Sequence, residues 1–130
     1  MLYRLANAAE IAGSEASGFY VGGQLDKKSG FLHLSTAEQV VKTAALYFVG
    51  APDLVLLTFD AAKLSAAPGC ELKWEDAAPP PGVVQRSGEF PHLYGASGAP
   101  WQALARSPEP LPLKADGQTH SFPPLAASPA

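Results

Sequence analysis

The first apolar and polar positions of the chain alternate with a period of two, which is the spacing of a β-strand. Residues 2–6 are therefore predicted to form a strand that places Tyr3 and Leu5 on one face and Arg4 on the other. Arg4 is then either a cation of a functional site or an ordinary solvated arginine.

A second alternating stretch, residues 29–38, is central to the prediction of function. Its strand would place Phe31, His33 and Ser35 on one face, with the intervening leucines on the other. Ser35 and the glutamate three residues later have the spacing of a capping box, which predicts that a helix begins at about Thr36. A helix N-terminus beside His33 would be a natural site for an anion.

The rest of the chain is predicted to contain one long helix, one buried strand and several shorter pieces. Apolar residues recur at helical spacing over 36–48, whereas 53–60 is an almost continuous apolar run typical of a central strand. Residues 8–16 are weakly helical, and 18–30 is interpreted as a loop because it contains four glycines. The shorter pieces are a turn or one helical turn at 61–64, an amphipathic strand at 71–75 and a loop at 76–88. An extended piece follows at 89–95, which Pro91 would confine to a sheet edge or an irregular position, and a last element ends over 101–105, with a strand as one interpretation.

Length and composition indicate one folded domain. The chain has 130 residues, of which 47% are hydrophobic and 16% are charged, so a packed core is expected. We assign residues 1–107 to this domain and the proline-rich residues 108–130 to an extended tail. A net charge of −3 gives no basic surface for an extended nucleic-acid duplex. The single cysteine, Cys70, suits a reducing compartment, and without a signal peptide or a membrane-length apolar run we predict a cytoplasmic protein that binds no membrane.

Motifs for metal, thiol and serine chemistry are weak. No Cys and His spacing suits zinc and no HExxH motif occurs, so we expect no metal. Cys70 could be a nucleophile, although a lone thiol is more often passive. The GxSxG motif of serine hydrolases is missing. Gly22 and Gly23 are interpreted as a turn because the known phosphate-loop patterns do not occur.

Strand alternation instead presents polar residues in pairs. If the pairs converge, their side chains could bind phosphate or hydroxyl groups, and a glutamate or a histidine could act as acid or base. The alternative is that the strands expose unrelated polar faces and that the histidines are structural. The pairs are His33 with Ser35, Lys73 with Glu75, and His92 with Tyr94.

Five short segments, taken in order, carry a resemblance to a known family. They are LYRL at 2–5, GFLHLSTAEQV at 30–40, DLVLL at 53–57, LKWE at 72–75 and FPHLY at 90–94. Together they resemble the domain of unknown function 952 family over a stretch from Leu2 to Trp101. The resemblance implies the ADP-ribosylation fold, an α+β arrangement of two packed, twisted sheets around a nucleotide cleft. The function of that family is not established.

The strand predicted within residues 29–38 also resembles a strand of an enzyme group that shares this fold. The His-Leu-Ser sequence at 33–35 is similar to the corresponding strand of RNA 2'-phosphotransferases, which consume NAD. By that likeness His33 and Ser35 would contact phosphate or nucleotide.

ADP-ribosyltransferases give a second comparison, because they use a first-strand arginine, a serine-threonine segment and a glutamate. Glu75 would then stabilise an oxocarbenium-like ribosyl state or position the acceptor. Lys73 stands where those enzymes carry an acidic or amide residue. The residues that match are Arg4, Ser35, Thr36 and Glu75.

We therefore predict an ADP-ribosyltransferase-like α+β domain whose polar cleft binds a nucleotide or a small anionic metabolite, with NAD as the candidate cofactor and group transfer as the candidate reaction. The alternative is a non-catalytic binding or structural module in which the same motifs hold the sheets together. The catalytic candidates are His33, Glu75 and His92. The binding candidates are Arg4, Ser35, Thr36, Lys73 and Tyr94.

Overall fold

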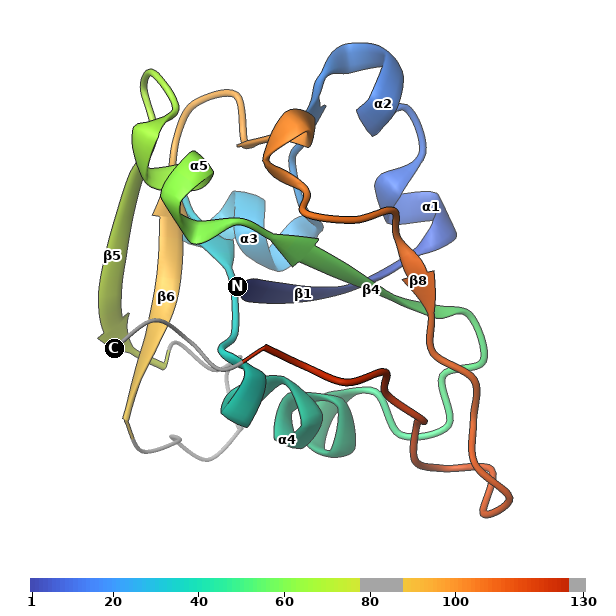
Figure 1. Ribbon diagram of the computed structural model, residues 1–130. Helices are drawn as coiled ribbons and strands as arrows, with labels where there is room; N and C mark the ends of the chain where they lie inside the picture. The colour runs from blue at the N-terminus through green and yellow to red at the C-terminus, as the bar shows by residue number, and fades with distance from the viewer. Residues whose placement is uncertain (78–87, 127–130) are drawn as a thin grey trace.

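The computed structural model describes residues 1–77 and 88–126, which form an α+β fold with three small antiparallel sheets (Figure 1). The first sheet has the strand order β1-β4-β8, with β1 at Leu2–Asn7, β4 at Leu54–Phe59 and β8 at Glu109–Pro110. β4 is the central strand, as its apolar run predicted, and all of its residues except Val55 are buried. The family resemblance implied two packed sheets, whereas the described residues form three.

Helix α4 (Ala37–Tyr47) packs along β1 and confirms the helix that was predicted from apolar spacing (Figure 1). Its Val40 and Ala44 are buried in one hydrophobic core with Tyr3 and Leu5 of β1. A second core lies on the opposite side of the β1–β4 pair, because alternate residues of a strand point to opposite faces.

The start of α4 lies one residue later than the sequence predicted. Its capping box is made by Thr36 and Gln39, whose side chains each bond the other's backbone N–H, and not by Ser35 and Glu38. The backbone of Ser35 is instead held by Tyr3 in two hydrogen bonds of 2.7 and 2.8 Å. Ser35 therefore still belongs to the extended segment, and the helix can begin only after it.

The second three-stranded sheet has the order β3-β6-β5, with β3 at Leu32–His33, β6 at Glu89–Tyr94 and β5 at Glu71–Asp76. β6 is the middle strand, so of the two alternatives predicted for the piece with Pro91, an edge or an irregular position, the edge is wrong. β3 is only two residues long, and just beyond it the Leu34 N–H donates to the Pro91 carbonyl at 3.0 Å. The missing proline N–H thus faces Leu34, just beyond the end of β3, where the ladder ends.

The region predicted as a loop, 18–30, contains strand β2 (Phe19–Tyr20) and helix α3 (Gln24–Ser29). β2 pairs with β7 (Ala99–Pro100) in the two-stranded third sheet. Gly30 ends α3 at a φ of 86°, a conformation that side chains disfavour. The glycines that suggested a loop therefore mark the ends of regular elements.

Four further short helices connect the sheets. No helix within residues 1–77 and 88–126 is long and apolar enough to cross a membrane. The 3-10 helix η1 (Trp101–Ala103) occupies most of the stretch 101–105, so the interpretation of that stretch as a strand is wrong. The helices are α1 at Ala8–Ile11, α2 at Ser14–Ser17, α5 at Ala61–Ala66 and the 3-10 helix η1 at Trp101–Ala103.

The proline-rich segment after residue 107 is extended, and it packs against the domain. Its Leu111 is buried in the core shared by β1 and α4, and β8 adds a strand to β4. His120 Nε2 lies 2.7 Å from the Ala51 carbonyl. Near the end of the described chain, the Ala126 N–H donates to the Tyr3 hydroxyl at 2.7 Å. The described part of the tail is therefore a packed part of the fold.

Candidate functional site

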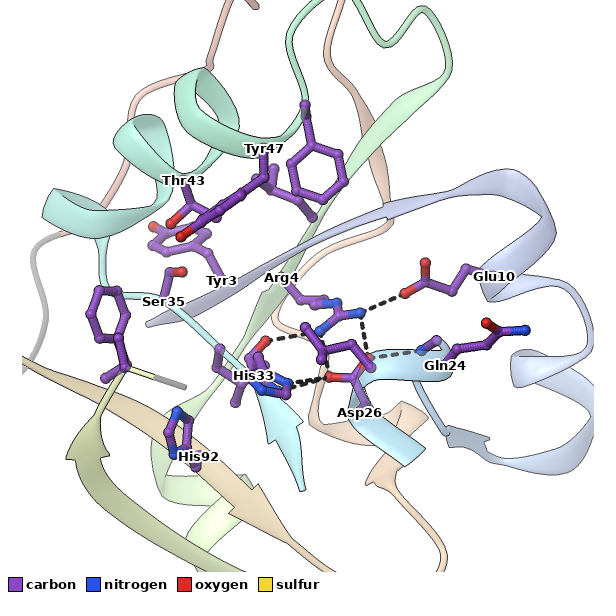
Figure 2. A pocket seen from close by; sticks show the side chains of 17 residues that line it. Tyr3, Arg4, Glu10, Gln24, Asp26, His33, Ser35, Thr43, Tyr47 and His92 are labelled. Atoms are coloured by element: carbon purple, nitrogen blue, oxygen red, sulfur yellow. Dashed lines mark hydrogen bonds and ion pairs between the residues drawn. The ribbon is translucent and has the colours of Figure 1, made fainter. Parts of the chain in front are cut away.

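Arg4 lies at the centre of a buried ion-pair cluster (Figure 2). Its Nη1 donates to Asp26 Oδ1 at 2.7 Å and to the His33 carbonyl at 3.0 Å. Its Nη2 donates to Asp26 Oδ2 and to Glu10 Oε1, both at 2.7 Å. The Arg4 side chain is only 13% exposed, so the interpretation as a solvated surface arginine is wrong.

Asp26, on α3, connects this cluster to His33. Beyond its two bonds with Arg4, it accepts from the backbone N–H of Gly23 at 2.8 Å and of His33 at 3.0 Å, and its Oδ1 lies 2.9 Å from His33 Nδ1. Burial alone would raise the pKa of Asp26, but the His33 hydrogen bonds and the Arg4 charge outweigh it and hold that pKa well below its usual range. Gly22 permits this approach, because a Cβ there would lie 2.6 Å from Asp26 Oδ2.

Glu10 and Tyr20 complete the cluster. Glu10 is placed by α1, whose N-cap Asn7 accepts from the Glu10 N–H. Its Oε1 accepts from the Tyr20 hydroxyl as well as from Arg4, and the guanidinium lies over the Tyr20 ring, 5.6 Å from its centroid. Burial and then Glu10 raise the pKa of Tyr20 more than Arg4 lowers it, so the hydroxyl stays protonated.

His33 and His92 are brought together by the pairing of β3 with β6. They are direct cross-strand partners, and their ring centroids lie 5.5 Å apart at an interplanar angle of 65°. Directly opposite residues share a face of a sheet, which is why both side chains point to the same side. The Phe31 ring stacks on His92 at 4.1 Å and lies 4.6 Å from His33. The structure thus joins the two histidines that the sequence singled out.

His92 has a carboxylate partner of its own. Its Nδ1 lies 2.9 Å from Glu75 Oε1, which also accepts from the Tyr94 hydroxyl at 2.7 Å. These two hydrogen bonds, first that of Tyr94 and then that of His92, lower the pKa of Glu75. Burial lowers the pKa of His92, and the nearby His33 adds to this effect, while Glu75 opposes it. His92 is therefore neutral at physiological pH.

A cavity of about 340 Å³ lies beside these clusters, between β1, α3 and α4. Its polar side is formed by Arg4, Glu10, Asp26 and His33, and its opposite wall includes Tyr47 of α4 (Figure 2). Most of the remaining lining is apolar. A volume of this size suits one flat ring system, since small-molecule pockets begin at about 300 Å³.

The predicted site residues divide into two groups. Those that line the cavity are Arg4, His33, Ser35 and His92. Those that do not are Thr36, Lys73, Glu75 and Tyr94. The single cleft expected from sequence is thus a cavity with an adjoining sheet face, and His92 belongs to both.

Thr36 and Lys73 do not have the positions that a phosphate-binding role requires. The Thr36 hydroxyl accepts from the Gln39 N–H within the helix cap. The Lys73 ammonium lies 3.8 Å from Glu71 Oε2 and over the Tyr94 ring, 4.7 Å from its centroid, with 47% of the side chain exposed. Neither group adds positive charge to the cavity.

Sequence reasoning missed Glu10, Asp26, Tyr20 and Tyr47. Asp26 lay in the segment interpreted as a loop, so its place in the first turn of a helix was not recognised. An acidic residue three positions after Gly23 is the signal that could have found it, since acidic side chains are favoured at helix N-termini. Tyr47 lies within the helix predicted over 36–48, and its spacing gives no sign of a role in a site.

The cavity residues are the ones that could hold an organic cofactor or substrate. Tyr47 offers an aromatic face, and His33 offers a ring nitrogen, Nε2, that is buried without a hydrogen-bond partner. In the described ranges no group of three or more His, Cys, Asp or Glu side chains is arranged to hold a metal ion. The arrangement can therefore stack a ring and exchange a proton.

A family model and solved structures match the chain over most of its length. The family described as "Protein of unknown function (DUF952)" matches residues 5–106. The crystal structure of protein CC0527 from Caulobacter crescentus is 34% identical, with 92% of each chain covered and a TM-score of 0.73. The solution NMR structure of CC0527 is 35% identical, covers 91% of this chain and 90% of the other, and has a TM-score of 0.69. No curated protein matches the sequence significantly.

Proposed function

The chain belongs to the DUF952 family, a family of unknown function, and we propose that its cavity binds a small molecule through a flat ring on which His33 and His92 act as acid and base. The observation that carries this proposal is the pairing of the two histidines, whose ring centroids lie 5.5 Å apart. Each Nδ1 lies 2.9 Å from a carboxylate oxygen, and both residues line the cavity. A nucleobase or a nicotinamide ring is the kind of group that fits the volume.

The carboxylate partners determine which ring nitrogen is reactive. Asp26 faces His33 Nδ1 and Glu75 faces His92 Nδ1, each at 2.9 Å, so in the neutral rings the proton lies on Nδ1 and Nε2 accepts. His33 Nε2 has no hydrogen-bond partner in the described structure. A ligand donor at this nitrogen would satisfy it, and a neutral imidazole is suited to proton transfer near neutral pH.

NAD-dependent group transfer on an ADP-ribosylation-like fold is the narrower form of the proposal. The cavity volume supports a nicotinamide ring, and Arg4 and Ser35 are on its lining. The roles proposed for Glu75 and Tyr94 have less support, because these residues lie behind His92. A nucleotide or another phosphate-bearing metabolite thus remains the proposed class, with its ring end in the cavity.

A non-catalytic structural role is the second candidate, and one observation favours it. Arg4, Asp26 and His33 join β1, α3 and β3 through bonds that a purely structural cluster would also make. Buried ion pairs of this kind can serve to fix one arrangement of a fold.

Calorimetric titration of the whole chain with NAD, ADP-ribose and nicotinamide separates the two candidates. We expect binding that His33→Ala weakens by about tenfold, the loss of one hydrogen bond to a ring. Lys114→Ala, on an exposed tail residue, should change nothing. If His33→Ala and Glu75→Gln lower the stability but leave ligand affinity unchanged, the structural role is correct.

The cytoplasm is the compartment that we propose. Cys70 is a free thiol, and a lone cysteine suits a reducing environment. The proposed partner is a small molecule, because the net charge of −3 offers no basic surface for nucleic acid. Fractionation with a thiol-labelling assay on Cys70 in cells would test the compartment.

A further inference from the structure

We propose that the cavity selects a ring that is neutral or positively charged and excludes anions, so that any phosphate of the ligand lies outside it. This inference deepens the proposed function and rests on it. It concerns the ligand class, because the sequence alone favoured an anionic ligand.

The first argument is that Arg4 has no terminal donor left for an anion. A guanidinium carries five N–H groups, four of them on the two Nη atoms. Nη1 bonds Asp26 and the His33 carbonyl, and Nη2 bonds Asp26 and Glu10, all within 3.0 Å. A phosphate or carboxylate would have to displace one of these acceptors to reach the Nη atoms, and the remaining donor, the unpartnered Nε–H, is itself buried. The most obvious anion receptor of the cavity is therefore already occupied.

The second argument is the charge of the described lining. One guanidinium, Arg4, stands against two carboxylates, Asp26 and Glu10, which leaves one net negative charge when the histidines are neutral. Among the described lining residues Arg4 is the one lysine or arginine, and Lys73 lies outside the lining. Carboxylates in a partly buried site repel an anion more strongly than they would in water.

The third argument is the shape and chemistry of the cavity entrance. Leu25 of α3 and Tyr47 of α4 both line the cavity and are 40% and 38% exposed. They offer an apolar and an aromatic surface, which stack on a flat ring. An aromatic face also attracts a cation, so a pyridinium ring would bind more tightly there and a carboxylate less tightly.

Matched probes that differ in charge test this inference. Nicotinamide and nicotinate share one ring and differ in the charge that it carries, and 1-methylnicotinamide, methylated on the ring nitrogen, adds a cationic form. Two-dimensional NMR of the whole chain at neutral pH would follow the ring signals of Tyr47 and His33 as each probe is added. We expect nicotinamide and 1-methylnicotinamide to bind at least about tenfold more tightly than nicotinate.

Glu10→Gln provides the decisive variant, because it removes one negative charge and keeps the shape. It should improve nicotinate affinity by about threefold or more and leave nicotinamide nearly unchanged. Glu15→Gln makes the same chemical change on an exposed residue of α2 that does not line the cavity. It should alter neither affinity.

Failure of this inference can be told apart from failure of the proposed function. If nicotinate binds as tightly as nicotinamide or more tightly, or if Glu10→Gln does not favour the anion, the charge selection is wrong although a ring-binding cavity exists. If no probe perturbs Tyr47 or His33, both the selection and the ring-binding function are wrong.

Discussion

His33 and His92 face each other across the β3–β6 ladder, and each ring is held through Nδ1 by a carboxylate from another element. Asp26 comes from α3 and Glu75 from β5, so two independent parts of the chain fix the same tautomer in both rings. Phe31 stacks against the pair.

Replacing Arg4 by methionine should lower the free energy of unfolding by about 3–5 kcal/mol, because Asp26 and Glu10 would lose their buried cation. Urea unfolding followed by circular dichroism would measure it. Arg106→Met removes a pair whose arginine side chain is 53% exposed, so its effect should stay below about 1 kcal/mol. Equal losses in the two variants would contradict a structural role for the Arg4 cluster.

Acidification should destabilise the protein through His92. The pKa of His92 is lowered in the folded state, so below the ordinary value of 6.5 the unfolded chain takes up a proton that the native state resists. Stability therefore falls as the pH drops from about 7 towards 5. Unfolding free energies at several pH values would show the slope, and His92→Gln should flatten it. A native His92 that titrates at or above the ordinary value in NMR would contradict this account.

Tyr94→Phe should raise the pKa of Glu75, because the Tyr94 hydroxyl is the largest contributor to its lowered value. The Glu75 carboxyl can be followed directly by carbon NMR during a pH titration. Tyr47→Phe removes a hydroxyl that makes no contact with Glu75, and it should leave the titration unchanged. No movement in Tyr94→Phe would mean that the 2.7 Å hydrogen bond is not formed in solution.

Gly22→Ala should destabilise the fold more than Gly13→Ala does. Both glycines have positive φ, 78° and 82°, so both variants carry the same backbone penalty of about 1–2 kcal/mol. At Gly22 the new Cβ would also lie 2.6 Å from Asp26 Oδ2 and from Leu32 Cδ2, whereas at Gly13 nothing lies within 4 Å. The difference between the melting temperatures of the two variants measures the cost of the new Cβ contact at position 22. Equal decreases in melting temperature would show that Asp26 and Leu32 move aside freely.

The spacing of apolar residues along the chain was sufficient to predict the elements that bury a regular apolar face. β1, β4 and α4 each bury one or two faces, and the spacing of their apolar residues records this directly. β2 and α3 lack such a pattern. Each is at most six residues long and directly follows a glycine, so both depend on contacts with distant segments, which a linear pattern cannot show.

The residues of the candidate site also divide into those that a local pattern predicts and those that it does not. His33 and His92 could be predicted because strand alternation placed them beside aromatic residues. The charged partners of Arg4 could not, since Glu10 and Asp26 lie 6 and 22 residues away and neither spacing belongs to a strand or helix rule. Lys73 misled the prediction for the same reason, because its position in the ladder is known only once β5 is paired.

The packing of the proline-rich segment has a consequence for how the chain folds as it is synthesised. β1 emerges first, yet β4, the strand it pairs with, and β8, which completes that sheet, follow much later. The Ala126–Tyr3 hydrogen bond spans 123 residues. Contacts of such long range fold slowly. The core between β1 and α4 therefore stays open on the ribosome until the segment that carries Leu111 has been translated, and during that time the buried face of α4 is available to chaperones.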